Sequence, residues 1–161
     1  MPILHTQLTG QGQTPDGKPV AIPSPIALTQ RGPVLQVTLG VEQTIAQQLL
    51  AQGIKLPEPI SGLALIDTGA TSTCIDETVA KQLKLPVVDV VTISSASHSK
   101  TEQNVYPVLI EVVGLPIKFN TLRAIGVSLA NQGLQVLIGR DLLQLCTLFY
   151  NGMIGSFTLS I

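Results

Sequence analysis

The sequence predicts one all-β domain, mainly strands with two or three short helices, closed into a compact barrel or sandwich. From Leu35 to Val41, apolar residues alternate with Gln, Thr and Gly, which is the pattern of a strand with one buried face. Other β-rich runs lie at 63–66, 87–93, 105–113, 117–125, 135–138, 147–150 and 156–161. With 161 residues, 45% of them hydrophobic, the chain can form one domain with a substantial core.

Three short helices are expected between these strands. A Gln-rich stretch that begins near Val41 has apolar residues at helical spacing and ends at Gly53, a suitable C-terminal cap. The second helix begins at Asp76, whose carboxylate can accept hydrogen bonds from first-turn N–H groups, and ends before Pro86. A brief third helix contains Leu142, Leu143 and Leu145.

The N-terminal segment 1–32 differs in composition from the rest of the chain. It is rich in Gly, Pro, Gln and Thr and shows weak periodicity, which indicates an arm or an irregular segment over the surface. We therefore divide the chain into an N-terminal arm, residues 1–32, and one domain, residues 33–161.

Composition argues against several classes of function. Only 12% of the residues are charged and the formal net charge is -1, so no basic surface is expected to attract nucleic acid or an anionic membrane. Every apolar stretch is interrupted before it reaches membrane-spanning length. The N-terminus lacks the basic start and sustained apolar region of a secretory signal. We expect a cytoplasmic protein with neither nucleic acid nor membrane as a partner.

The cysteine and histidine residues do not predict a metal site. Cys74 and Cys146 lie far apart in apolar settings, and only His5 and His98 could supply nitrogen ligands. The simplest interpretation is two buried, reduced thiols, with a disulfide between them as the alternative.

The most informative segment is Asp67-Thr68-Gly69, which follows the apolar run 63–66 and continues as Ala70-Thr71-Ser72-Thr73. Alone, this motif could be an ordinary Asp/Thr/Gly turn. Far downstream, Val136-Leu137-Ile138 runs into Gly139-Arg140-Asp141 and a helix. Together the two segments resemble the retropepsin family, the single-domain aspartic proteases of retroviruses and their cellular and bacterial relatives, and the chain is similar to a bacterial-type member. The resemblance extends from about residue 34 to residue 161.

This resemblance implies a closed acid-protease barrel, with one lobe per chain and Asp67 as the catalytic residue. Because the motif occurs once and the chemistry needs two carboxylates, a homodimer is required for activity. Two adjacent carboxylates hold one shared proton, so the ionised one can activate a water while the protonated one hydrogen-bonds the scissile carbonyl. This chemistry requires neither a metal nor a cofactor.

The three residues after Asp67 would support the active site. By resemblance, Thr68 directs its hydroxyl across the dimer axis to the partner's backbone. Gly69 has no side chain, so its N–H can approach the carboxylate closely. Ala70 lacks the hydroxyl found there in pepsin-like enzymes and stabilises the ionised dyad less, so we expect activity at mildly acidic to near-neutral pH.

The second motif is expected to have a structural role. Leu137, Ile138 and Gly139 would form a core strand that ends in a turn beside the active site. Arg140, by resemblance, ties the active-site region to the dimer interface, whereas Asp141 has a simpler interpretation as a solvated charge at a helix start.

A substrate-covering flap is expected in the hairpin at 93–101, with Ser95, Ala96, Ser97 and His98 at its tip. Retroviral flap tips are usually rich in glycine, and this segment has none. We interpret His98 as an exposed turn histidine and not as a catalytic one.

The chain departs from the retroviral pattern in two further ways. Thr71 stands where retroviral proteases often have Asp, so a carboxylate contact to substrate or to Arg140 is missing. Retroviral dimers interleave their terminal strands, whereas this chain has a long N-terminal arm that could supply an interface strand, be removed, or wrap the barrel. The C-terminal segment 156–161 could still supply an interface strand.

The leading hypothesis is an aspartic endopeptidase that cleaves extended peptides in a groove under two flaps. The alternative is a non-catalytic retropepsin-like module that dimerises and binds a peptide or partner protein. A third hypothesis, small-molecule binding in a β-barrel, accounts less well for Asp67.

Overall fold

The computed structural model describes residues 2–95 and 98–161. The strands are β1 (Ile3–Gln7), β2 (Gly10–Gln13), β3 (Pro19–Ile22), β4 (Val34–Val41), β5 (Ile60–Ile66), β6 (Cys74–Asp76), β7 (Asp89–Ser95), β8 (His98–Val112), β9 (Lys118–Val127), β10 (Val136–Ile138), β11 (Thr147–Asn151) and β12 (Ser156–Ser160). The α-helices are α1 (Ser24–Arg31), α2 (Gln43–Ala51), α3 (Glu77–Gln82) and α4 (Arg140–Leu143), and a 3-10 turn spans Ala130–Gln132. The mainly β prediction is confirmed.

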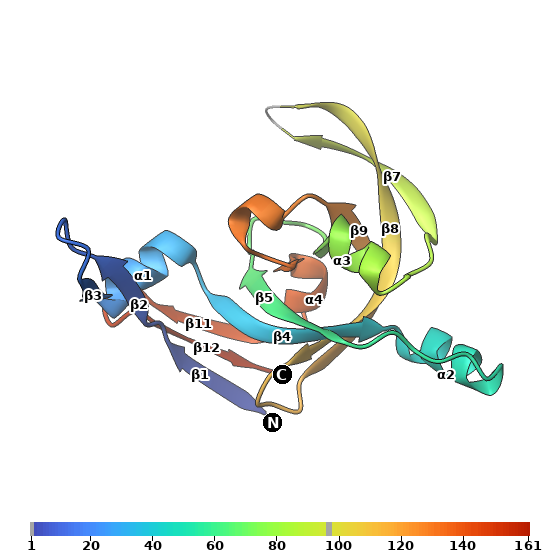
Figure 1. Cartoon of the computed structure of the whole chain (residues 1–161), viewed down its shortest axis with the longest axis horizontal. Helices are drawn as coiled ribbons and strands as arrows, with labels where there is room; N and C mark the ends of the chain where they lie inside the picture. Colours follow the sequence, from blue (N-terminus) through green and yellow to red (C-terminus); the bar gives the residue numbers. More distant parts are fainter. Residues whose placement is uncertain (1, 96–97) are drawn as a thin grey trace.

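Six strands close into a barrel, as the sequence predicted (Figure 1). The hydrogen-bonded order is β4, β5, β10, β6, β9 and β8, and β8 pairs again with β4 to complete the circle. Burial alternates along β4, where Val37 and Leu39 are fully buried and the intervening Thr38 is not. Ile110 and Val136 complete the same core from other strands, so the barrel is filled with side chains.

Two of the barrel pairings are parallel and set the geometry of the motif strands. β10 runs parallel to β5, with Leu137 opposite Leu65 and Ile138 opposite Ile66. The strands that precede the two motifs therefore end side by side, although the motifs themselves lie far apart in the sequence.

A second sheet contains both ends of the chain, in the order β1, β12, β11. Phe157 and Leu159 of β12 are fully buried, and β12 also contacts α1. Gly155 has a left-handed backbone, φ +68°, and a Cβ there would collide with the backbone of Ser24. Only glycine therefore allows the β11–β12 turn to approach the start of α1.

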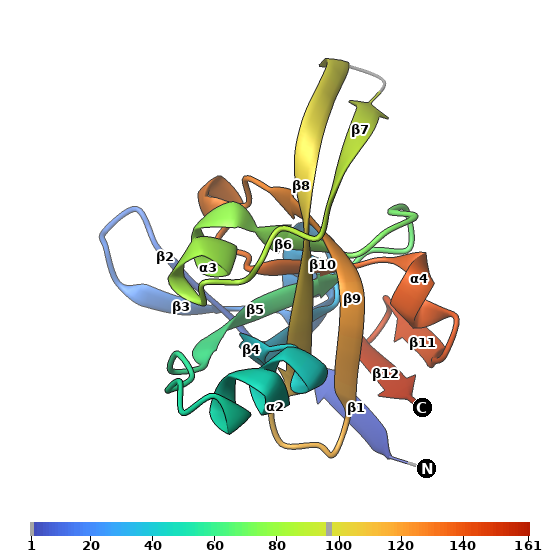
Figure 2. The same ribbon diagram turned by 90° about the vertical axis from the view of Figure 1, so that its right-hand side faces the viewer.

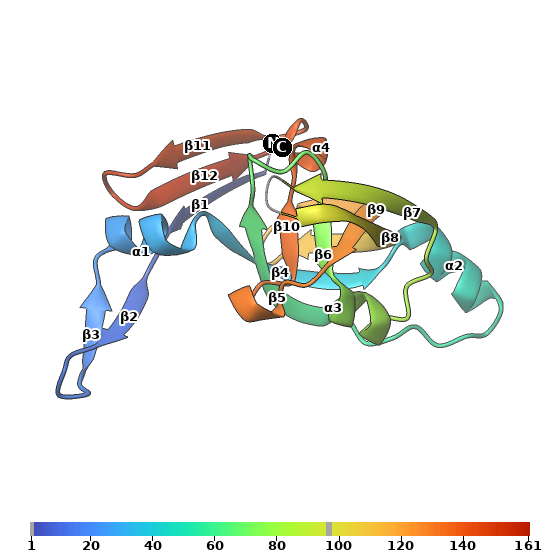
Figure 3. The ribbon, with the colours of Figure 1, turned by 90° about the horizontal axis from the view of Figure 1, so that it is seen from above.

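The N-terminal segment 1–32 is more regular than its composition indicates. It forms β1, the β2–β3 hairpin and α1, and Figure 3 shows the hairpin extending away from the barrel. Pro25 lies in the first turn of α1, where its missing N–H is not needed, and Gly32 ends the helix with φ +70°. The weak apolar pattern hid these elements, because β2 and β3 expose most of their side chains.

The helices lie near their predicted positions. Asp76 caps α3 as predicted and accepts a hydrogen bond from the Thr78 N–H at 2.9 Å. Gly53 follows α2 with φ +74°. α4 begins directly after Gly139 but ends at Leu143, so the prediction was wrong in placing Leu145 inside the third helix.

A long hairpin of β7 and β8 projects from the barrel (Figure 2). Ile93 of β7 pairs with Thr101 of β8, and Ser95 pairs with His98. The fifteen-residue strand β8 forms both the hairpin and a wall of the barrel, so the hairpin is continuous with the barrel. In the described part of the chain, no helix is long and apolar enough to cross a membrane.

Candidate active site

Asp67 follows the last residue of β5, at the point where the two motif strands end together. Its N–H donates to the carbonyl oxygen of Ile138 at 2.9 Å, which extends the β5–β10 pairing by one residue. Ile66 and Ile138 are buried beneath it, whereas Asp67 itself is half-buried. A rigid apolar support thus presents the carboxylate at a loop.

The loop after Asp67 folds back onto the carboxylate. Oδ1 accepts hydrogen bonds from the N–H groups of Gly69 at 2.9 Å and Ala70 at 3.1 Å. A Cβ at position 69 would lie 3.1 Å from the same oxygen, which is tighter than ordinary van der Waals contact. Glycine therefore allows the N–H of residue 69 to reach the Asp67 carboxylate without crowding it. This is the close approach of the N–H to the carboxylate that the sequence predicted.

Arg140 binds this loop from the start of α4. Its Nη1 donates to the carbonyl oxygen of Thr68 at 3.1 Å and its Nη2 donates to Oγ1 of Thr71 at 2.9 Å. The Arg140 N–H also donates to the carbonyl oxygen of Ala70 at 3.0 Å. The sequence predicted that position 71 offers Arg140 no carboxylate. The Thr71 hydroxyl instead accepts a hydrogen bond from the guanidinium group. The predicted link from Arg140 to a dimer interface stays a prediction.

Asp141 is not simply a solvated charge, so that interpretation was wrong. Its carboxylate accepts hydrogen bonds from the N–H and the hydroxyl of Thr73, at 2.9 and 2.8 Å. Thr73 is fully buried, and its Oγ1 also accepts from the Gly139 N–H at 3.1 Å. Three residues from the two motifs therefore form one hydrogen-bonded cluster. Asp141 and Thr73 are 68 positions apart, and only the joint occurrence of the two motifs indicates their contact.

Gly139 is required by the close approach of two backbones. A Cβ at this position would lie 2.5 Å from the carbonyl carbon of Ser72 and 2.8 Å from the nitrogen of Thr73. Real Cβ atoms do not approach backbone atoms so closely, so a larger residue would push the segments apart. Ile138 is fully buried and Leu137 is half-buried, which fits a core strand that ends at Gly139.

The cysteines near the site are free thiols. Burial, together with the negative charges of Asp141 and Asp67, raises the pKa of Cys74 to about 11. Burial also raises the pKa of Cys146. Both thiols therefore stay protonated near neutral pH and are poor nucleophiles. The described residues contain no group of three or more potential metal ligands.

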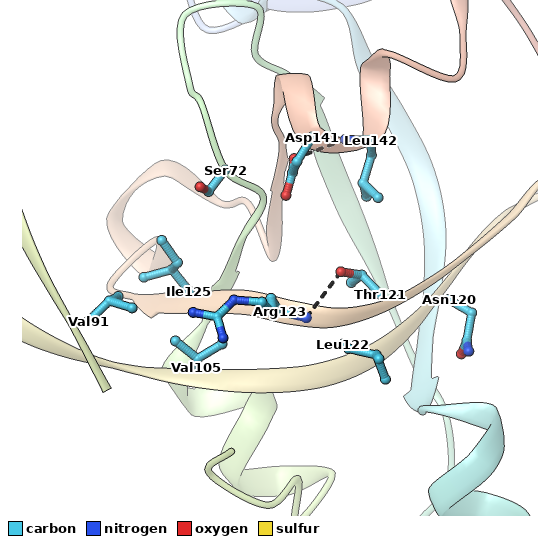
Figure 4. A pocket seen from close by; sticks show the side chains of 10 residues that line it. All are labelled: Ser72, Val91, Val105, Asn120, Thr121, Leu122, Arg123, Ile125, Asp141 and Leu142. Atoms are coloured by element: carbon cyan, nitrogen blue, oxygen red, sulfur yellow. Dashed lines mark hydrogen bonds between the residues drawn. The ribbon is translucent and has the colours of Figure 1, made fainter. Parts of the chain in front are cut away.

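A cavity of about 530 Å³ lies between the motif segments and the base of the hairpin (Figure 4). One wall is formed by Ser72, Asp141 and Leu142, and the opposite wall by β9 with contributions from β7 and β8. Its lining residues are Ser72, Val91, Val105, Asn120, Thr121, Leu122, Arg123, Ile125, Asp141 and Leu142. Asp67 does not line this cavity. The cavity lies beside the loop that follows Asp67, which we call the Asp67 loop.

Arg123 is a residue of this cavity that the sequence did not indicate. Its Nη2 donates to Oδ2 of Asp89 at 2.8 Å, which joins β9 to the start of β7. The Arg123 hydrogen bond holds the pKa of Asp89 below its ordinary value, with a further contribution from the Val90 N–H. The pair therefore bridges β9 and β7 at the base of the hairpin.

The structure places the predicted flap residues on the projecting hairpin only in part. Ser95 ends β7 and His98 begins β8, and their backbones pair. Ala96 and Ser97 lie outside the described residues. The assignment of a flap to this hairpin stays a prediction.

A closed six-stranded barrel with an Asp-Thr-Gly loop bound by a Gly-Arg-Asp segment defines a retropepsin-like fold. The family model described as "gag-polyprotein putative aspartyl protease" matches residues 61–145, which is more than half of the chain. The chain belongs to this family, and the resemblance inferred from its two motifs is confirmed.

Among solved structures, the crystal structure of a retropepsin-like aspartic protease from Rickettsia conorii is similar to this chain. The identity is 14%, the alignment covers 98% of this chain and 92% of that chain, and the TM-score is 0.39. No curated protein sequence matches the chain.

Proposed function

We propose that the protein is a homodimeric aspartic endopeptidase in which each chain supplies one Asp67. The observation that carries the proposal is the presentation of Asp67, whose half-buried carboxylate is oriented by two backbone N–H groups at the end of a rigid strand pair. The Asp-Thr-Gly motif occurs once in the chain, so a second carboxylate in the same setting must come from a second copy. Residues 33–161 form the protease domain of this proposal, and residues 1–32 its arm.

The proposed reaction is hydrolysis by an activated water. Two facing Asp67 carboxylates hold one proton between them, because two adjacent negative charges repel. The ionised Asp67 takes a proton from the water, and the protonated Asp67 hydrogen-bonds the scissile carbonyl oxygen. When the tetrahedral intermediate collapses, the departing amine receives a proton from the dyad. The arrangement is general acid–base catalysis without a covalent enzyme intermediate.

The supporting residues have defined parts in this proposal. Gly69 and Ala70 orient the carboxylate through their N–H groups, and Arg140 holds the loop through Thr68 and Thr71. The hydroxyl of Thr68 is proposed to contact the partner's backbone across the dimer axis. Leu137, Ile138 and Gly139 support the loop from below.

The proposed substrate is an extended peptide bound beneath the β7–β8 hairpin. An extended peptide can satisfy its backbone hydrogen bonds against a strand, while its side chains enter neighbouring pockets. The cavity beside the Asp67 loop has apolar walls from Val91, Val105, Ile125 and Leu142, so it suits an apolar side chain of the peptide. The hairpin, including Ser95, Ala96, Ser97 and His98, is proposed to act as the flap.

The test compares wild type with Asp67→Asn on a peptide library between pH 4 and pH 8. We expect wild type to cleave at mildly acidic to near-neutral pH. The kcat/KM of Asp67→Asn should fall at least about a thousandfold, as expected when one member of a catalytic pair is lost. Equal cleavage by both proteins would exclude Asp67 as the catalytic residue. Peptide binding without cleavage by wild type would instead support the non-catalytic module.

Dilution tests the shared site separately. Activity per chain should fall when the enzyme is diluted below the dissociation constant of its dimer, measured by sedimentation. Activity per chain that does not change with dilution would contradict a site built from two chains.

A further inference from the structure

Two oppositely charged side chains lie on opposite walls of the cavity between the motif segments and the base of the hairpin (Figure 4). The carboxylate of Asp141 is directed into the cavity from α4, and the side chain of Arg123 lies along the opposite wall, on β9. Between them the walls include the apolar side chains of Val91, Val105, Ile125 and Leu142. The cavity is therefore lined like a ligand pocket, in which a few polar groups are placed among apolar surfaces.

Arg123 owes its position to an irregularity in β9. The pairing of β8 with β9 shifts register between Tyr106 and Val108, so the consecutive residues Leu122 and Arg123 face a single residue of β8. Both are exposed, whereas a regular strand would direct them to opposite faces. Such bulges redirect side chains and are frequent beside active sites. The position of Arg123 is therefore specific to this bulge and does not follow from strand alternation.

Among the described residues, both charged groups have unused hydrogen-bonding capacity. A guanidinium group has five N–H donors, and one of them, on Nη2 of Arg123, donates to Oδ2 of Asp89 at 2.8 Å. The carboxylate of Asp141 accepts from the N–H and the hydroxyl of Thr73 and from the N–H of Leu142. Because a carboxylate offers about four acceptor positions, one remains for a ligand. The cavity thus presents donors on one wall and an acceptor on the other.

These features discriminate among the long side chains of a peptide. A carboxamide carries both a donor and an acceptor without a charge, so it can bond to both walls. A glutamate would place a second carboxylate near Asp141, and a lysine would place an ammonium group near Arg123 and offer it no acceptor. A methionine would fit the apolar walls but make no such hydrogen bond with either charged group. Glutamine therefore matches the whole cavity, because its stem is apolar and its end is a carboxamide.

We propose that this cavity is a specificity pocket for a glutamine side chain of the substrate peptide. The amide oxygen of the glutamine accepts from the Arg123 guanidinium, and its amide nitrogen donates to the Asp141 carboxylate. Its methylene groups lie against the apolar walls. This proposal rests on the proposed peptide-cleaving function, and it narrows the apolar side chain expected in the cavity to one that ends in a carboxamide.

Binding to a peptide array tests the pocket without requiring cleavage. The probe is a fluorescent Asp67→Asn chain, applied to hexapeptides that carry Gln, Glu, Lys or Met at each position in turn among mixed residues. At one position we expect Gln to be bound at least about tenfold more strongly than the other three, as for hydrogen bonds to charged groups. If at every position one of the other three is bound as strongly as Gln, the proposal is overturned.

A pair of variants separates recognition by Arg123 from its structural part. Arg123→Met and Asp89→Asn both remove the ion pair at the base of the hairpin, but only Arg123→Met removes the guanidinium group. In the Asp67→Asn chain, Arg123→Met should abolish the preference for Gln and favour Lys, because Asp141 is then the charged group that remains. Asp89→Asn should keep the preference for Gln, and urea unfolding checks that both variants are folded. A preference that survives Arg123→Met, or that both variants lose equally, would contradict recognition by Arg123 and overturn the pocket.

The same peptides separate the pocket from the enzyme. Wild type that cleaves peptides with no preference for Gln would reject the pocket and keep the protease. Selective binding of Gln by Asp67→Asn, with no cleavage of the same peptides by wild type, would support the pocket and reject the protease. Absence of both binding and cleavage would reject both proposals.

Discussion

The substitution Thr73→Val removes one hydroxyl from the cluster that joins the two motifs. Oγ1 of Thr73 donates to Asp141 at 2.8 Å and accepts from the Gly139 N–H at 3.1 Å, in a fully buried position. Valine has nearly the same shape, so packing is retained. A hydrogen bond to a charged group contributes about 1.5–3 kcal/mol, and a buried N–H without a partner costs about 1–3 kcal/mol. Because the Thr73 N–H still donates to Asp141, we expect a total loss near the lower sum, about 2.5 kcal/mol.

Urea unfolding at one fixed protein concentration measures this loss. With a slope of about 2 kcal/mol/M, the midpoint of Thr73→Val should fall by about 1.2 M. The matched control Thr73→Ser keeps the hydroxyl and loses one methyl group, so it should lose only about 1 kcal/mol. If Thr73→Val is as stable as Thr73→Ser, the hydroxyl does not hold the two motifs together. Asp141→Asn should also have a smaller effect in the Thr73→Val background than in wild type, because the two groups interact.

Two further predictions concern Asp76 and Arg140. Burial opposes ionisation of Asp76, but the N–H groups of Leu129 and Thr78, at 2.8 and 2.9 Å, outweigh it and hold the pKa of Asp76 below its ordinary value. Its ionised form therefore stabilises the fold above about pH 4, and this contribution is lost as the pH falls through the lowered pKa. Asp76→Asn should lower the free energy of unfolding by about 2 kcal/mol at pH 7 and by clearly less near pH 3, measured by urea unfolding; an equal loss at both pH values would show that ionisation has no part in it. Arg140→Lys should lower kcat/KM for peptide cleavage by about tenfold with little change in the urea midpoint, because an ammonium group cannot bond Thr68 and Thr71 together as the guanidinium does. Full activity of Arg140→Lys would show that the loop does not need the two guanidinium hydrogen bonds to Thr68 and Thr71.

Local patterns were sufficient for most of the barrel and for the position of the candidate site. The alternation in β4 and the cap at Asp76 are signals carried within a few residues, so the strand and the helix lie where they were predicted. The Asp-Thr-Gly motif located the loop, and the second motif located the strand that pairs beside it. The cluster of Thr73, Gly139 and Asp141 could not be derived in detail, because its hydrogen bonds join residues of two distant segments.

The elements of the N-terminal segment 1–32 depend even more on distant contacts. β1 has little apolar pattern of its own, and its partner β12 lies at the other end of the chain. No local signal distinguishes such a strand from an irregular arm. Similarly, the sequence allowed segment 156–161 to supply an interface strand, and only the structure shows that β12 is paired on both edges within the chain.

The sequence by itself determined the class of fold, the family and the single carboxylate around which a site can be built, because these depend on period, caps and contiguous motifs. The tertiary structure decided which edges of the terminal sheet stay free and how Arg140 and Asp141 hold the Asp67 loop. The physical reason is that strand pairing is set by hydrogen bonds and burial between segments far apart in the chain. A short sequence window therefore cannot show which edge of a strand is already occupied.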